Sequence, residues 1–99
     1  MRIRLMDSGD AAAVAVLNGQ LGYLAAADAM KERLAFILRT TDTVLFIAEN
    51  DGAVVGWVQV LGVHFLASAR SFAEIGGLVV DVNSRRRGIG RALVSEVEG

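Results

Sequence analysis

The spacing of apolar residues changes once along the chain, and this change separates a helical first part from a β-rich second part. Residues 2–6 alternate between charged and apolar side chains, which predicts a short, half-buried strand. Two stretches with apolar residues three and four positions apart follow, which predicts two amphipathic helices. Asp7 or Ser8 is a suitable N-cap for the first helix. The apolar positions of the two helices are Val14, Leu17, Leu21 and Leu24, and then Met30, Leu34, Ile37 and Leu38.

From residue 43 onward the pattern is typical of strands. The run TVLFIAEN (43–50) ends at the turn sequence Asn-Asp-Gly, and AVVGWVQVLGVHFL (53–66) is the expected return strand of a hairpin. A third strand is expected at 74–82, EIGGLVVDV, where Gly76 and Gly77 permit a bulge. Apolar residues at 89, 92, 93 and 97 then form one face of a helix. This order predicts the α/β fold class, as an α+β domain with a mixed sheet and a central meander.

Composition narrows the classes of function. The chain has 99 residues, which fits one domain, and 54% of them are apolar, so a lone chain should leave apolar surface for a partner. It has no cysteine and one histidine, so we expect no disulfide, no cysteine nucleophile and no metal site. The sequence contains neither a membrane-length apolar run nor a signal peptide, which favours the cytoplasm and no membrane partner. The net charge of −1 argues against a nucleic-acid partner.

The segment SRRRGIGRAL (84–93) is basic and rich in glycine, and it lies where a predicted strand leads into a predicted helix. A helix N-terminus offers unpaired amides, and glycines let a phosphate approach the backbone closely. Several arginines beside such a site suit a pyrophosphate. Two other phosphate motifs do not fit. A P-loop would need Lys-Ser/Thr where Arg91 and Ala92 stand, and a dinucleotide fingerprint would need glycine where Leu93 stands.

Arg85, Gly88 and Gly90 match in register the acyl-CoA signature Arg/Gln-x-x-Gly-x-Gly/Ala. The chain therefore resembles the GNAT superfamily of N-acetyltransferases. The resemblance covers essentially the whole chain, since the family's first strand, two helices, hairpin, bulged fourth strand and pyrophosphate loop all have counterparts. It implies a truncated GNAT-like acyltransferase fold. One domain is expected at 1–99, incomplete at its C-terminus, because the family's fifth strand, next helix and last two strands have no counterpart.

The resemblance implies an N-acetyltransferase. It would transfer an acetyl group from acetyl-CoA, its cosubstrate, to a primary amine by direct attack and without a metal. The identity of the acceptor amine stays open. In the family, the strand before the loop pairs with the pantetheine arm and the loop binds the pyrophosphate. The corresponding residues here are Leu78, Val79 and Val80 for the pantetheine, and Arg85, Arg86, Arg87, Gly88, Ile89, Gly90, Arg91 and Ala92 for the pyrophosphate.

The resemblance also suggests catalytic residues. A bulge at Gly76 and Gly77 would turn an amide toward the thioester carbonyl and stabilise the developing oxyanion. Glu74 matches the position of a general base in some members, and the alternative is a solvated or ion-paired strand end. The family's thiol-protonating tyrosine belongs to the absent helix, and Tyr23 is not expected to replace it. Residues 21–23 either shape the acceptor pocket or form a helix end.

A second function stays open. The chain could be a truncated, catalytically inactive module that binds acyl-CoA or only self-associates, since one wall of the family's cleft has no counterpart. Without a fifth strand, residues 74–82 form an apolar sheet edge, and such edges recruit other chains. We therefore predict a homo-oligomer, in the simplest case a homodimer, formed through this strand.

Overall fold

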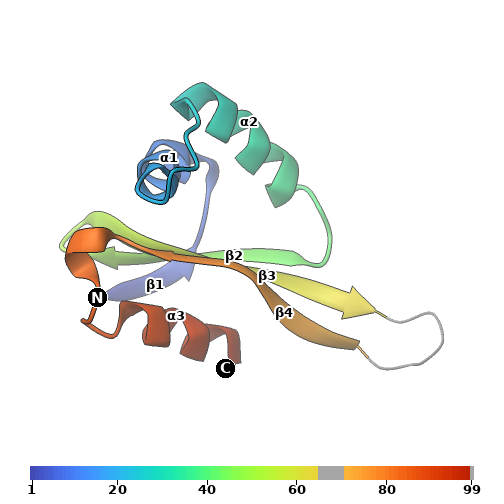
Figure 1. The fold of residues 1–99 in the computed structure, drawn as a ribbon. Helices are drawn as coiled ribbons and strands as arrows, with labels where there is room; N and C mark the ends of the chain where they lie inside the picture. The colour runs from blue at the N-terminus through green and yellow to red at the C-terminus, as the bar shows by residue number, and fades with distance from the viewer. Residues whose placement is uncertain (65–70, 99) are drawn as a thin grey trace.

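The computed structural model describes residues 1–64 and 71–98 (Figure 1). A first strand precedes two helices, three further strands follow them, and a last helix ends the described chain. The strands are β1 (Arg2–Leu5), β2 (Thr43–Asn50), β3 (Ala53–His64) and β4 (Ser71–Val80), the α-helices are α1 (Ala11–Gly19), α2 (Ala27–Leu38) and α3 (Ile89–Glu98), and two short 3-10 turns are η1 (Ser8–Asp10) and η2 (Val82–Ser84).

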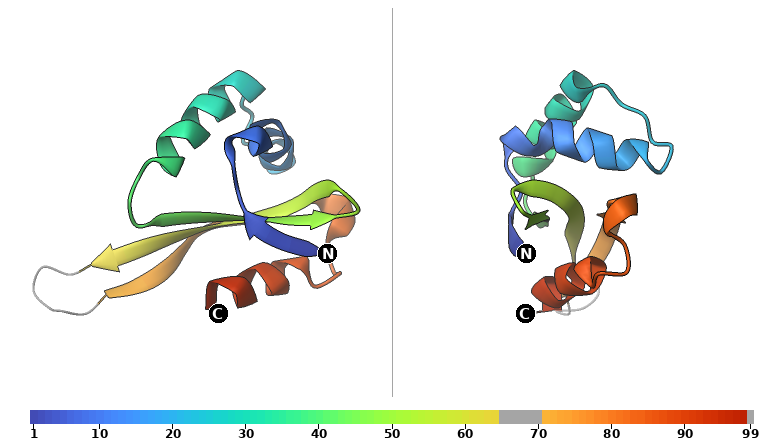
Figure 2. Two further views of the ribbon diagram at one scale, coloured as in Figure 1. Left: turned by 180° about the vertical axis from the view of Figure 1, so that it is seen from behind. Right: turned by 90° about the vertical axis from the view of Figure 1, so that its left-hand side faces the viewer.

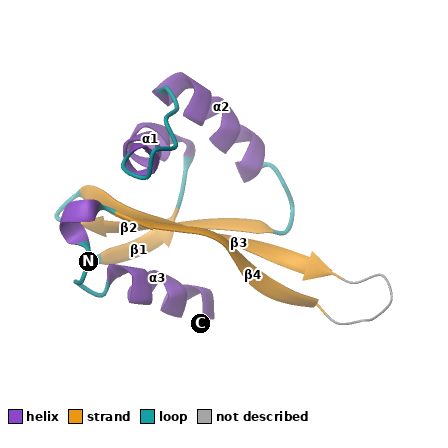
Figure 3. Cartoon of the chain, in the orientation of Figure 1, coloured by secondary structure: helices purple, strands orange, loops and turns teal. Residues whose placement is uncertain are grey.

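The strands form one sheet in the order β1-β2-β3-β4, and every described pair is antiparallel (Figure 3). This arrangement confirms the predicted α+β class, but the sheet, expected to be mixed, is antiparallel throughout the described strands. Helices α1 and α2 cover one face of the sheet, and α3 covers the other (Figure 2). The chain is thus a three-layer structure in which β4 occupies one edge.

Each sheet face has its own apolar core, because side chains alternate between faces along a strand. On the α1/α2 face, the fully buried Ile47 and its neighbours pack against both helices. On the α3 face, Val58 and Leu93 are fully buried. The α1/α2 core consists of Met6, Ala11, Val14, Met30, Leu34, Leu45 and Ile47, and the α3 core consists of Ala48, Val55, Val58, Ile89 and Leu93.

The bulge predicted at the glycine pair is confirmed. Gln59 of β3 pairs with Gly77, but the next residue, Val60, pairs with Ile75, so Gly76 is an extra residue in β4. A Cβ at Gly77 would lie 2.9 Å from Cη2 of Trp57, and one at Gly76 would lie 2.9 Å from Cδ1 of Leu61. Both positions are therefore too crowded for a larger side chain.

The first helix is shorter than predicted from its apolar spacing, which runs to Leu24. Asp7 is the N-cap of η1, in a capping box with Asp10, and the helix α1 that follows this turn ends at Gly19. A turn follows in which the N–H of Gly22 donates to the carbonyl of Gly19, and Gly22 itself has φ of +86°. Leu21 lies in this turn and Leu24 lies beyond it, and both are exposed, so they do not continue the buried stripe.

Two other predicted boundaries differ from the structure. Leu38, expected on the buried face of α2, is exposed at the end of that helix. The strand predicted at 74–82 is β4, which begins at Ser71 and ends at Val80, because the backbone turns into η2 after Asp81. Phe65 and Leu66, the last residues of the expected return strand, lie outside the described residues.

Within residues 1–64 and 71–98, no helix has both the length and the apolar character that a membrane crossing requires. The same residues contain no group of three His, Cys, Asp or Glu side chains placed to hold a metal ion.

Candidate functional site

The arginine-rich segment forms a loop between the edge strand and α3, and its start is fixed by α1. The Gln20 side chain donates to Oδ1 of Asp81 over 2.7 Å and accepts from the N–H of Val82 over 2.8 Å. The other carboxylate oxygen of Asp81 accepts from the Ser84 hydroxyl at 3.1 Å. These bonds hold the pKa of Asp81 below its usual value, the Gln20 contact contributing most. The carboxylate therefore stays ionised at the start of the loop.

The loop backbone turns sharply at two residues with left-handed conformations. Arg86 has φ of +68° and Gly88 has φ of +77°. A glycine adopts this conformation without steric cost, whereas an arginine does not. The turns create a surface pocket of about 470 Å³ at the start of α3. Its lining residues are Val80, Arg85, Arg86, Gly88, Ile89, Gly90 and Arg91.

The pocket is suited to an anion for two reasons. The first turn of a helix has amides without intrahelical acceptors, and in α3 the N–H of Ala92 donates to the Gly88 carbonyl at 2.9 Å, so the preceding amides remain available. Three arginines also line the pocket: Arg85, Arg86 and Arg91. Among the described residues, no carboxylate forms a salt bridge with any of the three. The charges of Arg86 and Arg91 are available to a bound anion, whereas Arg85 lies close enough to Asp81 to help lower the pKa of that carboxyl.

Two of the residues predicted for the pyrophosphate do not line this pocket. Arg87 is exposed beside it, and the amide of Ala92 is already used within the helix. The other six predicted positions, at 85, 86 and 88–91, all line the pocket. The structure thus gathers most of the predicted set around one cavity.

The predicted pantetheine strand leads directly into this pocket. Val80 is both the last residue of β4 and part of the pocket lining. Val79 is buried, whereas Leu78 is 40% exposed. In the described sheet β4 pairs only with β3, so its other edge is open to an added strand-like ligand.

Glu74 lies on the same strand, beyond the bulge. It is exposed and is paired in register with Leu61. Paired residues share a sheet face, and Leu61 shares its face with Gln59, two residues earlier. Glu74 therefore projects from the α1/α2 face, on the outer side of the bulge.

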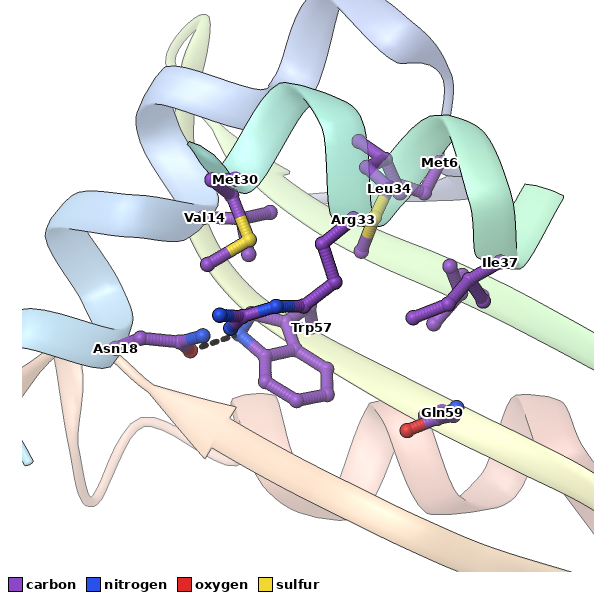
Figure 4. Close-up of a pocket in the computed structure, with 10 residues that line it drawn as sticks. Met6, Val14, Asn18, Met30, Arg33, Leu34, Ile37, Trp57 and Gln59 are labelled. Atoms are coloured by element: carbon purple, nitrogen blue, oxygen red, sulfur yellow. Dashed lines mark hydrogen bonds between the residues drawn. The ribbon is translucent and has the colours of Figure 1, made fainter. Parts of the chain in front are cut away.

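A second pocket, of about 210 Å³, lies between the α1/α2 helices and the sheet (Figure 4). We call it the helix–sheet pocket. The indole N–H of Trp57 donates to Oδ1 of Asn18 over 3.1 Å at one side of it. The lining residues are Met6, Val14, Asn18, Met30, Arg33, Leu34, Ile37, Leu45, Trp57 and Gln59.

The sequence interpretation missed the three polar and charged members of this pocket, Asn18, Arg33 and Gln59. Only Gln59 could have been noticed in the sequence as a candidate pocket residue, because it is a polar residue within an otherwise apolar strand. Residues 21–23, considered as contributors to an acceptor pocket, do not line it. Tyr23 is 72% exposed.

Comparison with known proteins identifies the family. The sequence model of the acetyltransferase (GNAT) family matches residues 12–99. No curated protein matches the chain. Solved structures are similar in fold at low identity. A GNAT family acetyltransferase from Staphylococcus aureus is 22% identical with a TM-score of 0.88, and the match covers 98% of this chain and 74% of that one.

Two further structures show the same likeness. A putative acetyltransferase from Agrobacterium tumefaciens is 24% identical with a TM-score of 0.88, over 99% of this chain and 71% of the other. Glucosamine-6-phosphate N-acetyltransferase from Arabidopsis thaliana is 22% identical with a TM-score of 0.81, over 98% and 71%. The fold, the arginine loop and the family match agree, and the chain belongs to the GNAT acetyltransferase family.

Proposed function

We propose that this protein transfers an acetyl group from acetyl-CoA to a primary amine by direct attack of the amine on the thioester. The observation that carries the proposal is the continuity of two features. The open edge of β4, with its bulge at Gly76, runs through Val80 into the arginine-lined pocket at the start of α3. One extended ligand with a pyrophosphate at one end fits both.

The pyrophosphate would bind at the loop pocket. The free amides of the first turn of α3 would donate to its oxygens, and Arg85, Arg86 and Arg91 would neutralise its charge. Arg87 and Ala92 were also predicted here. The exposed Arg87 is close enough in sequence to add a screened, longer-range attraction, whereas the amide of Ala92 has an acceptor already.

The pantetheine arm would pair with the backbone of residues 78–80, which brings the thioester toward the bulge. An amide turned outward by the bulge would stabilise the oxyanion that forms when the amine nitrogen attacks the carbonyl carbon. The carbon–sulfur bond then breaks, and CoA leaves as a thiolate that takes up a proton. Glu74, exposed two residues before Gly76, would accept the proton that the amine loses, through water.

Calorimetric titration with acetyl-CoA, combined with an assay for released thiol, tests this proposal. We expect saturable binding that Arg91→Glu abolishes and that Arg39→Glu, a charge change at the C-cap of α2 and outside the loop pocket, leaves intact. Thiol release that depends on an added amine would establish turnover. Binding without turnover would instead support the alternative, an inactive acyl-CoA-binding module. The absence of binding at millimolar acetyl-CoA would refute both.

We also propose that the chain without bound acetyl-CoA self-associates through residues 74–82, a use of the open edge of β4 that competes with the pantetheine arm at 78–80. Ile75 and Leu78 are each 40% exposed, and the pairing register puts both on the α3 face beside the open edge. Sedimentation measurements should give a concentration-dependent mass above the monomer. Ile75→Lys should shift it to the monomer, because a lysine on an edge strand opposes pairing. A wild-type chain that stays monomeric at all concentrations would contradict this proposal.

A further inference from the structure

We infer that the helix–sheet pocket selects the acceptor, and that this acceptor is an amine that also carries a carboxylate and one apolar side chain, as a free α-amino acid such as leucine does. The inference rests on the proposed acetyl transfer for its role in the reaction. The pocket, its charge and its ligand can be tested separately from that reaction.

The position of the helix–sheet pocket relative to the bulge carries the first step. Trp57 and Gln59 line the pocket, and both side chains lie over the glycine pair of β4. The Trp57 ring lies about 3 Å from the place a Cβ at Gly77 would take, and Oε1 of Gln59 lies 3.5 Å from the equivalent place at Gly76. A group in this pocket is therefore adjacent to the bulge, where the thioester is proposed to lie.

The inner wall of the pocket is apolar. Met6, Val14, Met30, Leu34 and Leu45 are all buried and form this wall. A volume of 210 Å³ equals about seven water-sized groups at ~30 Å³ each, so one aliphatic side chain fits and a second does not. This part of the pocket favours a ligand with a single side chain of leucine or methionine size.

Arg33 supplies the charge. Its side chain extends from α2 across the pocket toward Asn18 and Trp57 (Figure 4). Within the described part of the chain, no carboxylate forms a salt bridge or hydrogen bond with it. An unpaired guanidinium at the rim of a small apolar pocket is complementary to a carboxylate, which it can bind through two parallel hydrogen bonds.

The three groups have a consistent order. The carboxylate would lie at Arg33, the side chain against the apolar wall, and the amine near Gln59, whose carbonyl oxygen can accept from an ammonium group beside the bulge. A free α-amino acid has its amine and carboxylate on the same carbon as its side chain. It therefore satisfies all three contacts in one small molecule.

The test uses Trp57, the only tryptophan of the chain, as a reporter inside the pocket. Its fluorescence is titrated with L-leucine and with L-leucinamide, which has the same side chain and amine but no carboxylate. We expect a saturable change with L-leucine and about tenfold weaker binding of the amide, the size of one charge-assisted contact. Arg33→Gln should abolish this preference, and Arg39→Gln, which changes the arginine at the C-cap of α2 outside the pocket, should preserve it.

Equal binding of the two ligands, a preference that survives in Arg33→Gln, or no change in emission with either ligand would overturn the inference. The acetyl-CoA experiments test the proposed acetyl transfer separately from the acceptor class. If thiol release occurs with L-leucinamide as efficiently as with L-leucine, the acetyl transfer stands and the acceptor class is wrong. If L-leucine binds but acetyl-CoA does not, the pocket assignment stands and the proposed function fails.

Discussion

The side chain of Gln20 joins the end of α1 to Asp81, 61 residues later, through a hydrogen bond of 2.7 Å. The same amide group accepts from the backbone N–H of Val82 at 2.8 Å. One residue thus bridges the helical layer and the start of the arginine loop. This residue therefore links the helical layer, which lines the helix–sheet pocket, to the arginine loop, which lines the loop pocket.

Gln20→Leu should loosen the loop without removing any group proposed to touch a ligand. We expect acetyl-CoA to bind about threefold to tenfold more weakly, with only a small loss of stability because both bonds are exposed. Gln20→Glu should bind more weakly still at neutral pH, because it places a second carboxylate against Asp81. Calorimetry and urea unfolding measure the two effects. Wild-type affinity in both variants would show that the bridge does not position the loop.

Gly77→Ala should destabilise the fold by about 1–2 kcal/mol, because a Cβ there meets the Trp57 ring at 2.9 Å. The displaced indole should also change its emission spectrum. Gly90→Ala is a matched control, since its Cβ would meet only Cγ2 of Val80, at 3.7 Å, and alanine favours a helix. Urea unfolding should give opposite signs for the two variants. An equal stability change in both would contradict the packing argument.

Arg86→Gly should stabilise the protein while weakening acetyl-CoA binding. The steric cost of a left-handed arginine is about 1–2 kcal/mol, and the entropy cost of glycine is about 0.5–1 kcal/mol, so the net gain is about 0–1.5 kcal/mol. Asp51→Gly, at a position with φ of +51° in the β2–β3 turn, should be stabilised similarly with unchanged affinity. Thermal unfolding and calorimetry separate the effects. A stabilised Arg86→Gly chain with full affinity would remove Arg86 from the site.

Asp10→Asn should lower the free energy of unfolding at neutral pH, and that free energy should then fall less as the pH is lowered. Two oxygens of Asp10 accept from Arg4 at 2.7 and 2.8 Å, and these bonds hold the pKa of Asp10 below its ordinary value of 3.8. The unfolded chain therefore takes up the proton first on acidification. The contribution is complete above the unfolded pKa and is lost as the pH falls through the folded one.

We expect Asp10→Asn to cost about 1.5–3 kcal/mol at pH 7, the usual range for a hydrogen bond to a charged group. Asp7→Asn is the control, because Asp7 is exposed, 3.8 Å from Arg4, and asparagine is an equally good N-cap. Urea unfolding between pH 7 and pH 3 should show a shallower decline for Asp10→Asn than for the wild type. Parallel declines would contradict the assignment of the acid sensitivity to Asp10.

Much of this fold was predictable because its signals are local. The turn at residues 50–52, the alternation in β2 and β3 and the helical face of α3 depend on neighbours in sequence. The bulge was predictable because two adjacent glycines interrupt an apolar strand. The loop was predictable from the spacing of its arginines and glycines, and six of its eight assigned residues line one pocket.

The remaining features depend on contacts between distant residues. Asn18, Arg33 and Gln59 come from α1, α2 and β3, and only the packing of the helices on the sheet brings them together. Arg4 bonds to Asp10 and to Glu49 on the neighbouring strand, a network that no short sequence window contains. The end of α1 at Gly19 was missed because the apolar spacing continues past the turn that stops the helix.

The extra residue at Gly76 also changes which sheet face each residue beyond it occupies, compared with a regular strand. Ile75 and Leu78 are three positions apart, and in a regular strand they would face opposite ways, yet their partners Val60 and Val58 lie on the same face. The outer half of β4 is thus out of phase with the inner half. Deleting Gly76 should therefore remove the bulge and leave residues 73–75 on their present faces, because Ile75 and Gly77 would become neighbours opposite Val60 and Gln59.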